Sequence, residues 1–70
     1  MTLMAKIRNG QKVELLISGS EPICRELLGK ICNKMLSSGF KLVTLKDGRN
    51  GYAVKNPITK NIEIEYWLNV

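Results

Sequence analysis

Residues 18–39 read SGSEPICRELLGKICNKMLSSG, and this stretch decides how the rest of the chain can fold. Ser20 can accept hydrogen bonds from the first free amides of a helix, Glu21 suits the positive end of the helix dipole, and Pro22 is tolerated in the first turn. Gly39 can adopt the left-handed conformation that ends a helix. Between these ends apolar residues recur every three or four positions, which predicts one amphipathic helix. Its predicted apolar face consists of Ile23, Cys24, Leu27, Leu28, Ile31, Cys32, Met35 and Leu36.

Before the helix, apolar and polar residues alternate in two runs between residues 3 and 18. Period two predicts β-strands, and in the second run it puts Val13, Leu15 and Ile17 together on the face toward the helix. Asn9-Gly10 lies between the runs, and both residues tolerate the positive φ that a two-residue hairpin turn requires. The N-terminal segment is therefore predicted to be a β-hairpin.

After the helix, three further segments read as strands: FKLVTLK (40–46), YAVKN (52–56) and NIEIEYWLNV (61–70). The segment DGRNG separates the first two, and a short turn with Pro57 precedes the last. The element order is then ββαβββ, which predicts an α+β fold with one mostly antiparallel five-stranded sheet and a single amphipathic helix packed on one face. No repeat or linker divides the chain, so residues 1–70 are predicted to form a single domain.

One helix can cover only one face of such a sheet, and the predicted second face is not fully polar. It collects Leu16, Met4 and Trp67, with Val43 or Leu45, among charged residues. Three or four exposed apolar side chains are many for so small a monomer. The sequence therefore predicts a homo-oligomer that associates through this face or through a strand edge.

The residue content argues against an enzyme, a metal site or a cofactor site. The chain has no His and a single Asp, Asp47, which removes the common general bases, the usual triads and most zinc sites. Cys24 and Cys32 both fall on the apolar face of the predicted helix, where a small core side chain is the expected role. Their eight-residue spacing separates them by ~12 Å along that helix, too far for a disulfide.

The chain carries 11 Lys and Arg against 6 Asp and Glu, a net charge of +5 that favours polyanionic partners. It shows no signal sequence and no apolar run long enough to span a bilayer. Together with unpaired cysteines, these features predict a cytoplasmic protein that does not bind membranes.

The segment KDGRNGYAVKN (46–56) has the glycines and cations of a phosphate-binding loop. A Walker-type loop would require Lys-Ser or Lys-Thr at the start of a helix, whereas a strand is predicted to follow here. One interpretation is a plain hairpin turn, with Gly51 at a β-bulge. The other is a turn that also presents an exposed Arg49 at its tip, flanked by Lys46 and Lys55, to an anion.

The favoured functional hypothesis is a small non-enzymatic binding protein that uses its basic hairpins against a nucleic acid or a nucleotide-type anion. If the two hairpins share an edge, their cations form a basic rim. Alternatively, the strand lysines oppose Glu14, Glu63 and Glu65 across the sheet and form only a solvated surface. The predicted binding residues are Lys46, Arg49, Tyr52, Lys55, Lys6, Arg8 and Lys12.

A second hypothesis is a small interaction or inhibitor module that docks a protein target. Trp67 lies in a locally negative strand, between Glu65 and Asn69, which is unsuited to phosphates and suited to a protein contact. The predicted protein interface consists of Trp67, Leu16 and Met4.

Overall fold

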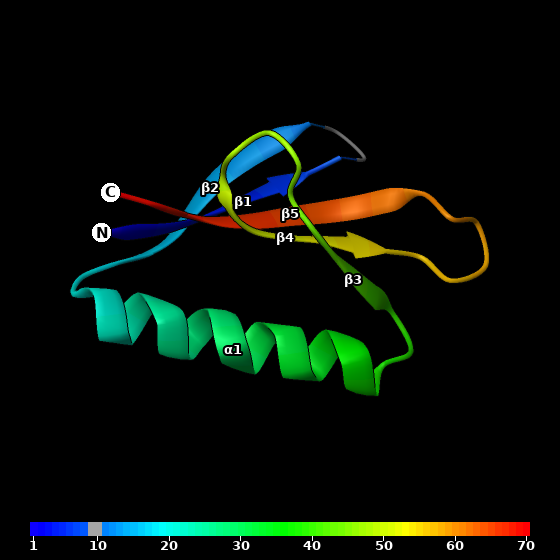
Figure 1. The fold of residues 1–70 in the computed structure, drawn as a ribbon, viewed down its shortest axis with the longest axis horizontal. Helices are drawn as coiled ribbons and strands as arrows, with labels where there is room; N and C mark the ends of the chain where they lie inside the picture. The colour runs from blue at the N-terminus through cyan, green and yellow to red at the C-terminus, as the bar shows by residue number, and fades with distance from the viewer. Residues whose placement is uncertain (9–10) are drawn as a thin grey trace.

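The computed structural model describes residues 1–8 and 11–70, and its elements follow the predicted order ββαβββ (Figure 1). One antiparallel five-stranded sheet lies against a single helix, which confirms the predicted fold class. The predicted Asn9-Gly10 turn lies outside the described residues. The elements are β1 (Thr2–Ile7), β2 (Lys12–Ser18), α1 (Glu21–Ser37), β3 (Lys41–Thr44), β4 (Asn50–Lys55) and β5 (Ile62–Asn69).

The strands lie in the order β2-β1-β5-β4-β3, and every neighbouring pair is antiparallel. The last strand of the chain is therefore the middle strand of the sheet. It separates the β1–β2 hairpin from the β3–β4 hairpin, so the two hairpins do not share an edge. A continuous basic rim made from both hairpin edges is therefore excluded.

The helix covers one face of the sheet and encloses the main core. It begins at Glu21, with Pro22 in its first turn, although Ser20 makes no side-chain capping bond. Gly39, with φ 92°, follows its last turn as predicted. Within the described residues no helix combines the length and apolar character needed to cross a bilayer. The buried core cluster consists of Leu3, Ala5, Cys24, Leu28, Val54, Tyr66 and Leu68.

Two residues of the predicted apolar helix face are not in the core. Ile23 is 49% exposed and Leu36 is 54% exposed, whereas Cys24 and Leu28 are buried. At about 100° per residue, Ile23 and Leu36 fall on opposite flanks of the stripe centred on Cys24 and Leu28. The sheet reaches only the centre of that stripe, so these two flanking residues of the predicted apolar face remain about half exposed.

A β-bulge interrupts the pairing of β1 with β2. Leu3 lies opposite Ile17, but the next residue, Met4, lies opposite Leu15, so Leu16 is an extra residue in β2. Side chains along a strand alternate between the two faces of the sheet. One extra residue therefore moves every side chain before it to the face opposite the one that simple alternation predicts. In the sequence, Leu15, Leu16 and Ile17 interrupt the alternation of apolar and polar residues at this point, but three consecutive apolar residues do not by themselves indicate an extra residue.

The bulge moves the N-terminal half of β2 to the opposite faces from those predicted. Glu14 pairs with Ala5, a core residue, and so lies on the helix side. Val13 and Leu15 instead lie on the side away from α1, opposite Lys6 and Met4 respectively. The predicted placement of Val13 and Leu15 with Ile17, and of Glu14 on the second face, was wrong for this reason.

Gly51 of β4 lies very close to the backbone of the neighbouring strand β5. It pairs in regular register with Trp67, and the shift in this strand pair lies between Val54 and Lys55, so the predicted bulge at Gly51 was wrong. A Cβ atom at Gly51 would overlap the carbonyl oxygen of Tyr66. Glycine is therefore required by backbone proximity.

We predict that Gly51→Ala lowers the free energy of unfolding by about 2 kcal/mol or more, because β4 and β5 must move apart to admit the methyl group. Gly29→Ala is the matched control: its Cβ meets nothing within 4 Å. Gly29 lies inside α1, so this change should stabilise the protein by roughly 0.5–1 kcal/mol. Denaturant unfolding of both variants measures the difference, and equal stabilities would contradict the close approach.

Candidate functional site

We use the term open face for the side of the sheet opposite α1. Leu42 packs against the core, so its neighbours Lys41 and Val43 point to the open face. Tyr66 and Leu68 are core residues, so Glu65 and Trp67 do the same. The strand residues of the open face are Thr2, Met4, Lys6, Val13, Leu15, Lys41, Val43, Gly51, Ala53, Lys55, Ile62, Glu65, Trp67 and Asn69.

The loop between β3 and β4, residues 45–49, folds over part of the open face. Figure 1 shows this loop on the side of the sheet away from α1. Its first residue, Leu45, is buried, and the Leu45 amide donates a hydrogen bond to the Gly51 carbonyl at 3.2 Å. The predicted turn is thus a five-residue connection that packs on the sheet instead of projecting from it.

Arg49 is held against the open face by three contacts. Its Nε donates to Asp47 Oδ2 at 2.7 Å, and a terminal guanidinium nitrogen lies 3.4 Å from Glu65 Oε1. The guanidinium carbon is 4.6 Å from the centroid of the Trp67 ring, a cation–π contact. The Arg49 side chain is 31% exposed. The expectation of a free cation at the hairpin tip was therefore wrong, because two carboxylates and the indole engage it.

The Arg49 backbone also binds Asp47. The Arg49 amide donates to Asp47 Oδ1 at 3.2 Å, the local hydrogen bond expected of an aspartate in a turn. This amide, and then the Arg49 side chain, stabilise the charged form of the carboxylate. Together they lower the pKa of Asp47 below its ordinary value of 3.8.

A shallow groove of about 430 Å³ runs between the loop and the sheet on the open face. Val43, Leu45 and Ala53 form its apolar part. Lys46 and Lys55 border it, together with Arg49, Asp47 and Glu65. Asp47 and Glu65 both contact Arg49, so the groove cations without an ion pair in the described residues are Lys46 and Lys55. The three cations and two carboxylates of the groove together carry a net charge of +1.

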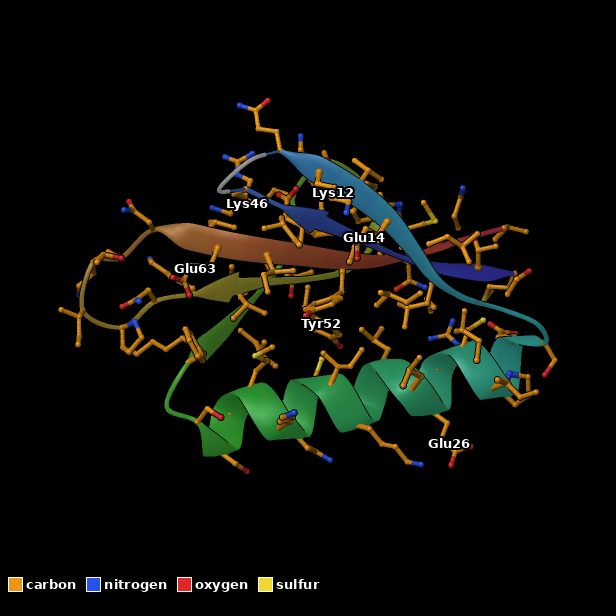
Figure 2. All side chains as sticks on the ribbon, turned by 180° about the vertical axis from the view of Figure 1, so that it is seen from behind. Lys12, Glu14, Glu26, Lys46, Tyr52 and Glu63 are labelled. Carbon is orange, nitrogen blue, oxygen red and sulfur yellow. The ribbon has the colours of Figure 1, made fainter. Side chains whose placement is uncertain are left out.

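Three of the predicted binding residues thus come together: Lys46, Arg49 and Lys55 all border the groove. Tyr52 does not join them. It alternates with the open-face residues of β4 and points toward α1 in Figure 2. There it borders a different hollow, of about 380 Å³, with Arg25. Its predicted role beside the loop cations is not supported by this placement, because adjacent strand residues point to opposite faces.

The N-terminal predicted cations are also divided between faces. Lys6 lies on the open face directly opposite Glu65, and the Arg8 amide donates to the Glu63 carbonyl at 2.9 Å. Lys12 pairs with Ile7 on the helix side, and its ammonium group lies 3.0 Å from Glu14. Of the three, Lys6 therefore shares the face of the groove, Lys12 lies on the helix side, and Arg8 contacts β5 through its backbone.

Lys41 is one of the cations of the predicted basic hairpins but not one of the predicted binding residues, and it lies directly opposite Lys55 in the β3–β4 pair. Both lysines point to the open face. The signal was present in the sequence, because a hairpin closing around Gly48 pairs residues 41 and 55. The pairing with Lys55 was not predicted, because the ends of strands, and hence the centre of the turn, are fixed by sequence only to within a few positions.

The residues of the predicted protein interface lie close together but are only partly available. Met4 and Trp67 are directly opposite each other on the open face, and both are half-buried. Arg49 covers part of the Trp67 ring. Leu16 occupies the bulge of β2. Their role as an interface stays a prediction, as does the absence of a catalytic, metal or cofactor site.

We predict that the Asp47 carboxyl in the folded protein titrates with a midpoint below 3.8. A depressed folded pKa means that the Asp47–Arg49 contacts stabilise the loop above the unfolded pKa and are lost as pH falls through the folded pKa. Side-chain carboxyl NMR measures the midpoint. Arg49→Ala should shift it only partly back, because the amide of residue 49 still donates; a wild-type midpoint at or above 3.8 would contradict the geometry.

Comparison with protein-family models, with curated proteins and with solved structures finds no match to this chain.

Proposed function

We propose that this protein is a non-enzymatic binding protein for the phosphate backbone of a nucleic acid, and that the contact lies on the open face. The observation that carries the proposal is the direct pairing of Lys41 with Lys55 across β3 and β4. Like charges opposite each other destabilise a sheet. A bound polyanion would relieve this repulsion, so the pair is unfavourable for folding and favourable for binding phosphates.

The distribution of ion pairs supports the same surface. Of the eleven basic side chains, Lys12, Arg25, Lys30 and Arg49 are in ion pairs with carboxylates, which leaves seven without one in the described residues. One of the seven, Lys34, belongs to α1. The other six belong to the sheet and its connections: Lys6, Arg8, Lys41, Lys46, Lys55 and Lys60.

The antiparallel register gathers most of these cations at one end of the sheet. Lys55 at the end of β4 pairs with Lys41 at the start of β3 and with Ile62 at the start of β5. The backbone amide of Arg8, just beyond β1, donates a hydrogen bond to the carbonyl of Glu63, the residue after Ile62. Cations from separate strands can thus meet successive phosphates along one side of a backbone. Arg49 contributes less than the sequence predicted, because Asp47 and Glu65 already neutralise it.

The aromatic residues favour contact with the backbone over contact with bases. Tyr66 and Phe40 pack in or against the core, and Tyr52 points toward α1. Trp67 on the open face is already stacked with Arg49. Base-stacking proteins present several free aromatic rings on one basic face. We therefore propose that the protein binds the phosphates of a nucleic acid with little sequence preference. A nucleotide-type ligand would use the same phosphate contacts in smaller number.

The decisive variant is Lys55→Gln, because it should change binding and stability in opposite directions. Binding to a short DNA or RNA should weaken, and the slope of log K against log salt should fall by about 1. The free energy of unfolding should rise by about 0.5 kcal/mol, because the repulsion from Lys41 disappears. Fluorescence anisotropy across a salt series and denaturant unfolding measure the two effects.

Lys34→Gln is the matched control, since Lys34 also lacks an ion pair in the described residues but lies on α1. It should leave affinity and its salt slope nearly unchanged. No detectable binding of the wild type at about 50 mM salt would remove the proposal. Equal losses from Lys34→Gln and Lys55→Gln would also remove it, because net charge alone would then explain binding.

The alternative of a protein-docking module is supported by the exposed apolar residues of β2, and not by Trp67, which suggested it in the sequence. The most exposed apolar side chains of the sheet are Val13 and Leu15 of β2, at 52% and 56% exposure, while Trp67 is half-buried beneath Arg49. These exposures favour an apolar docking surface centred on β2, one of the two edge strands, over one centred on Trp67.

A further inference from the structure

The outer strand β2 combines an unpaired edge with exposed apolar side chains. It ends the strand order, next to β1. Val13 and Leu15 are more than half exposed, and Leu16 beside them is exposed as well. An exposed apolar edge strand offers free backbone groups to another strand, and small domains that remain monomeric usually protect such an edge.

The hydrogen bonds of β1 identify which backbone groups of β2 are free. The Arg8 amide donates to β5, whereas the Met1 carbonyl accepts from Gly19, which follows β2. Backbone groups alternate in direction along a strand, so the odd-numbered residues of β1 are bonded to β2. Their partners before the bulge, Lys12 and Glu14, therefore direct their amides and carbonyls toward β1. Those of Val13 and Leu15 point to the open edge.

We propose that a second copy of this chain pairs antiparallel along β2, with Val13 opposite Val13 of the partner subunit on a two-fold axis. In this register the free backbone groups of Val13 meet their own counterparts. Lys12 lies opposite Glu14 of the partner subunit, and by symmetry Glu14 lies opposite Lys12 of the partner subunit. Opposite charges directly across a strand pair are favourable, so the sequence KVE is complementary to itself.

The neighbouring two-fold registers lack this complementarity. An axis at Glu14 sets two glutamates opposite each other, and an axis at Lys12 does the same for two lysines. An axis at Leu15 brings Val13 opposite Ile17 of the partner subunit. Beyond the bulge, Ile17 pairs with Leu3, so its backbone groups are already bonded to β1. Only the axis at Val13 satisfies both the charges and the hydrogen bonds.

The start of β2 limits the length of the new pairing. Since Lys12 lies opposite Glu14 of the partner subunit, the two β2 strands pair over Lys12, Val13 and Glu14 only, and Leu15 lies opposite residue 11, which precedes β2 and has φ 53°. This short window makes the charged pairs on either side of Val13 decisive. It also disfavours the addition of an arbitrary extended peptide, which lacks the complementary charges.

The proposed dimer places the open faces of both subunits on one surface and both helices on the opposite surface. Its axis is perpendicular to the sheet, so the open faces of both subunits lie on the same side of a continuous ten-stranded sheet, and the two helices lie on the other side. The unpaired cations of both subunits then share one surface. Pairing itself uses only β2 and does not depend on nucleic acid binding, so the two proposals can fail separately.

The first experiment measures solution mass without nucleic acid for the wild type and three charge variants. The wild type should show twice the chain mass of 7.9 kDa. Glu14→Lys and Lys12→Glu should each weaken the dimer by roughly tenfold, because each sets like charges opposite each other at two sites. The double variant K12E/E14K restores opposite charges and should restore the dimer. Failure of the double variant to recover would overturn the proposed register.

The second experiment locates the axis by disulfide crosslinking under mild oxidation. Val13→Cys should form a covalent dimer, because hydrogen-bonded residues across antiparallel strands have Cα atoms about 5.5 Å apart. Leu15→Cys should not, since the two copies of residue 15 would be separated by about 14 Å. The wild type, oxidised in parallel, controls for Cys24, which is buried, and Cys32.

Two results would overturn the proposal. One is a wild-type mass of a single chain at about 1 mM protein. The other is crosslinking of Leu15→Cys with none of Val13→Cys, which would move the axis to Leu15. Neither result concerns the Lys41–Lys55 surface, because both are obtained without nucleic acid.

Discussion

The pairing of β5 with both β1 and β4 is the constraint on which the other features of the structure depend. As the middle strand, β5 is hydrogen-bonded along both edges, so its alternation separates two environments. Tyr66 and Leu68 enter the core beneath α1, while Glu65 and Trp67 anchor Arg49 on the open face. At Gly51 the backbone of β4 lies in close contact with that of β5. The core and the candidate site are therefore formed by side chains on opposite faces of the same strand, β5.

Charge is distributed unevenly over this frame, and the distribution is more informative than the net charge of +5. The carboxylates are largely engaged by a minority of the cations, and the cations left unpaired lie mainly on the sheet. The Lys41–Lys55 pair sets two of them against each other. A sheet without a ligand would gain stability from almost any neutral partner at one of these positions. This cost to folding gives the polyanion proposal its physical basis.

The bulge at Leu16 has a similarly large effect through a single extra residue. It turns Val13 and Leu15 away from the helix and places Lys12 and Glu14 on the face toward the helix. The same residues then form a self-complementary edge, with apolar side chains on one face and opposite charges on the other. A sheet of five strands and one helix buries limited apolar surface at this chain length. A second copy joined at this edge would add to that buried surface.

The sequence by itself determined the element order, the start and end signals of the helix at Pro22 and Gly39, the antiparallel sheet and the grouping of Lys46, Arg49 and Lys55. These features follow from local periodicity and turn chemistry. Only the tertiary structure decided the strand order, the faces of β2 and the partners of Arg49. Strand order and bulges depend on contacts between residues far apart in sequence, and a one-residue shift reverses every face assignment. Arg49 was expected to be free because Glu65 and Trp67 are 16 and 18 positions away, and only the folding of the loop onto the sheet brings them together.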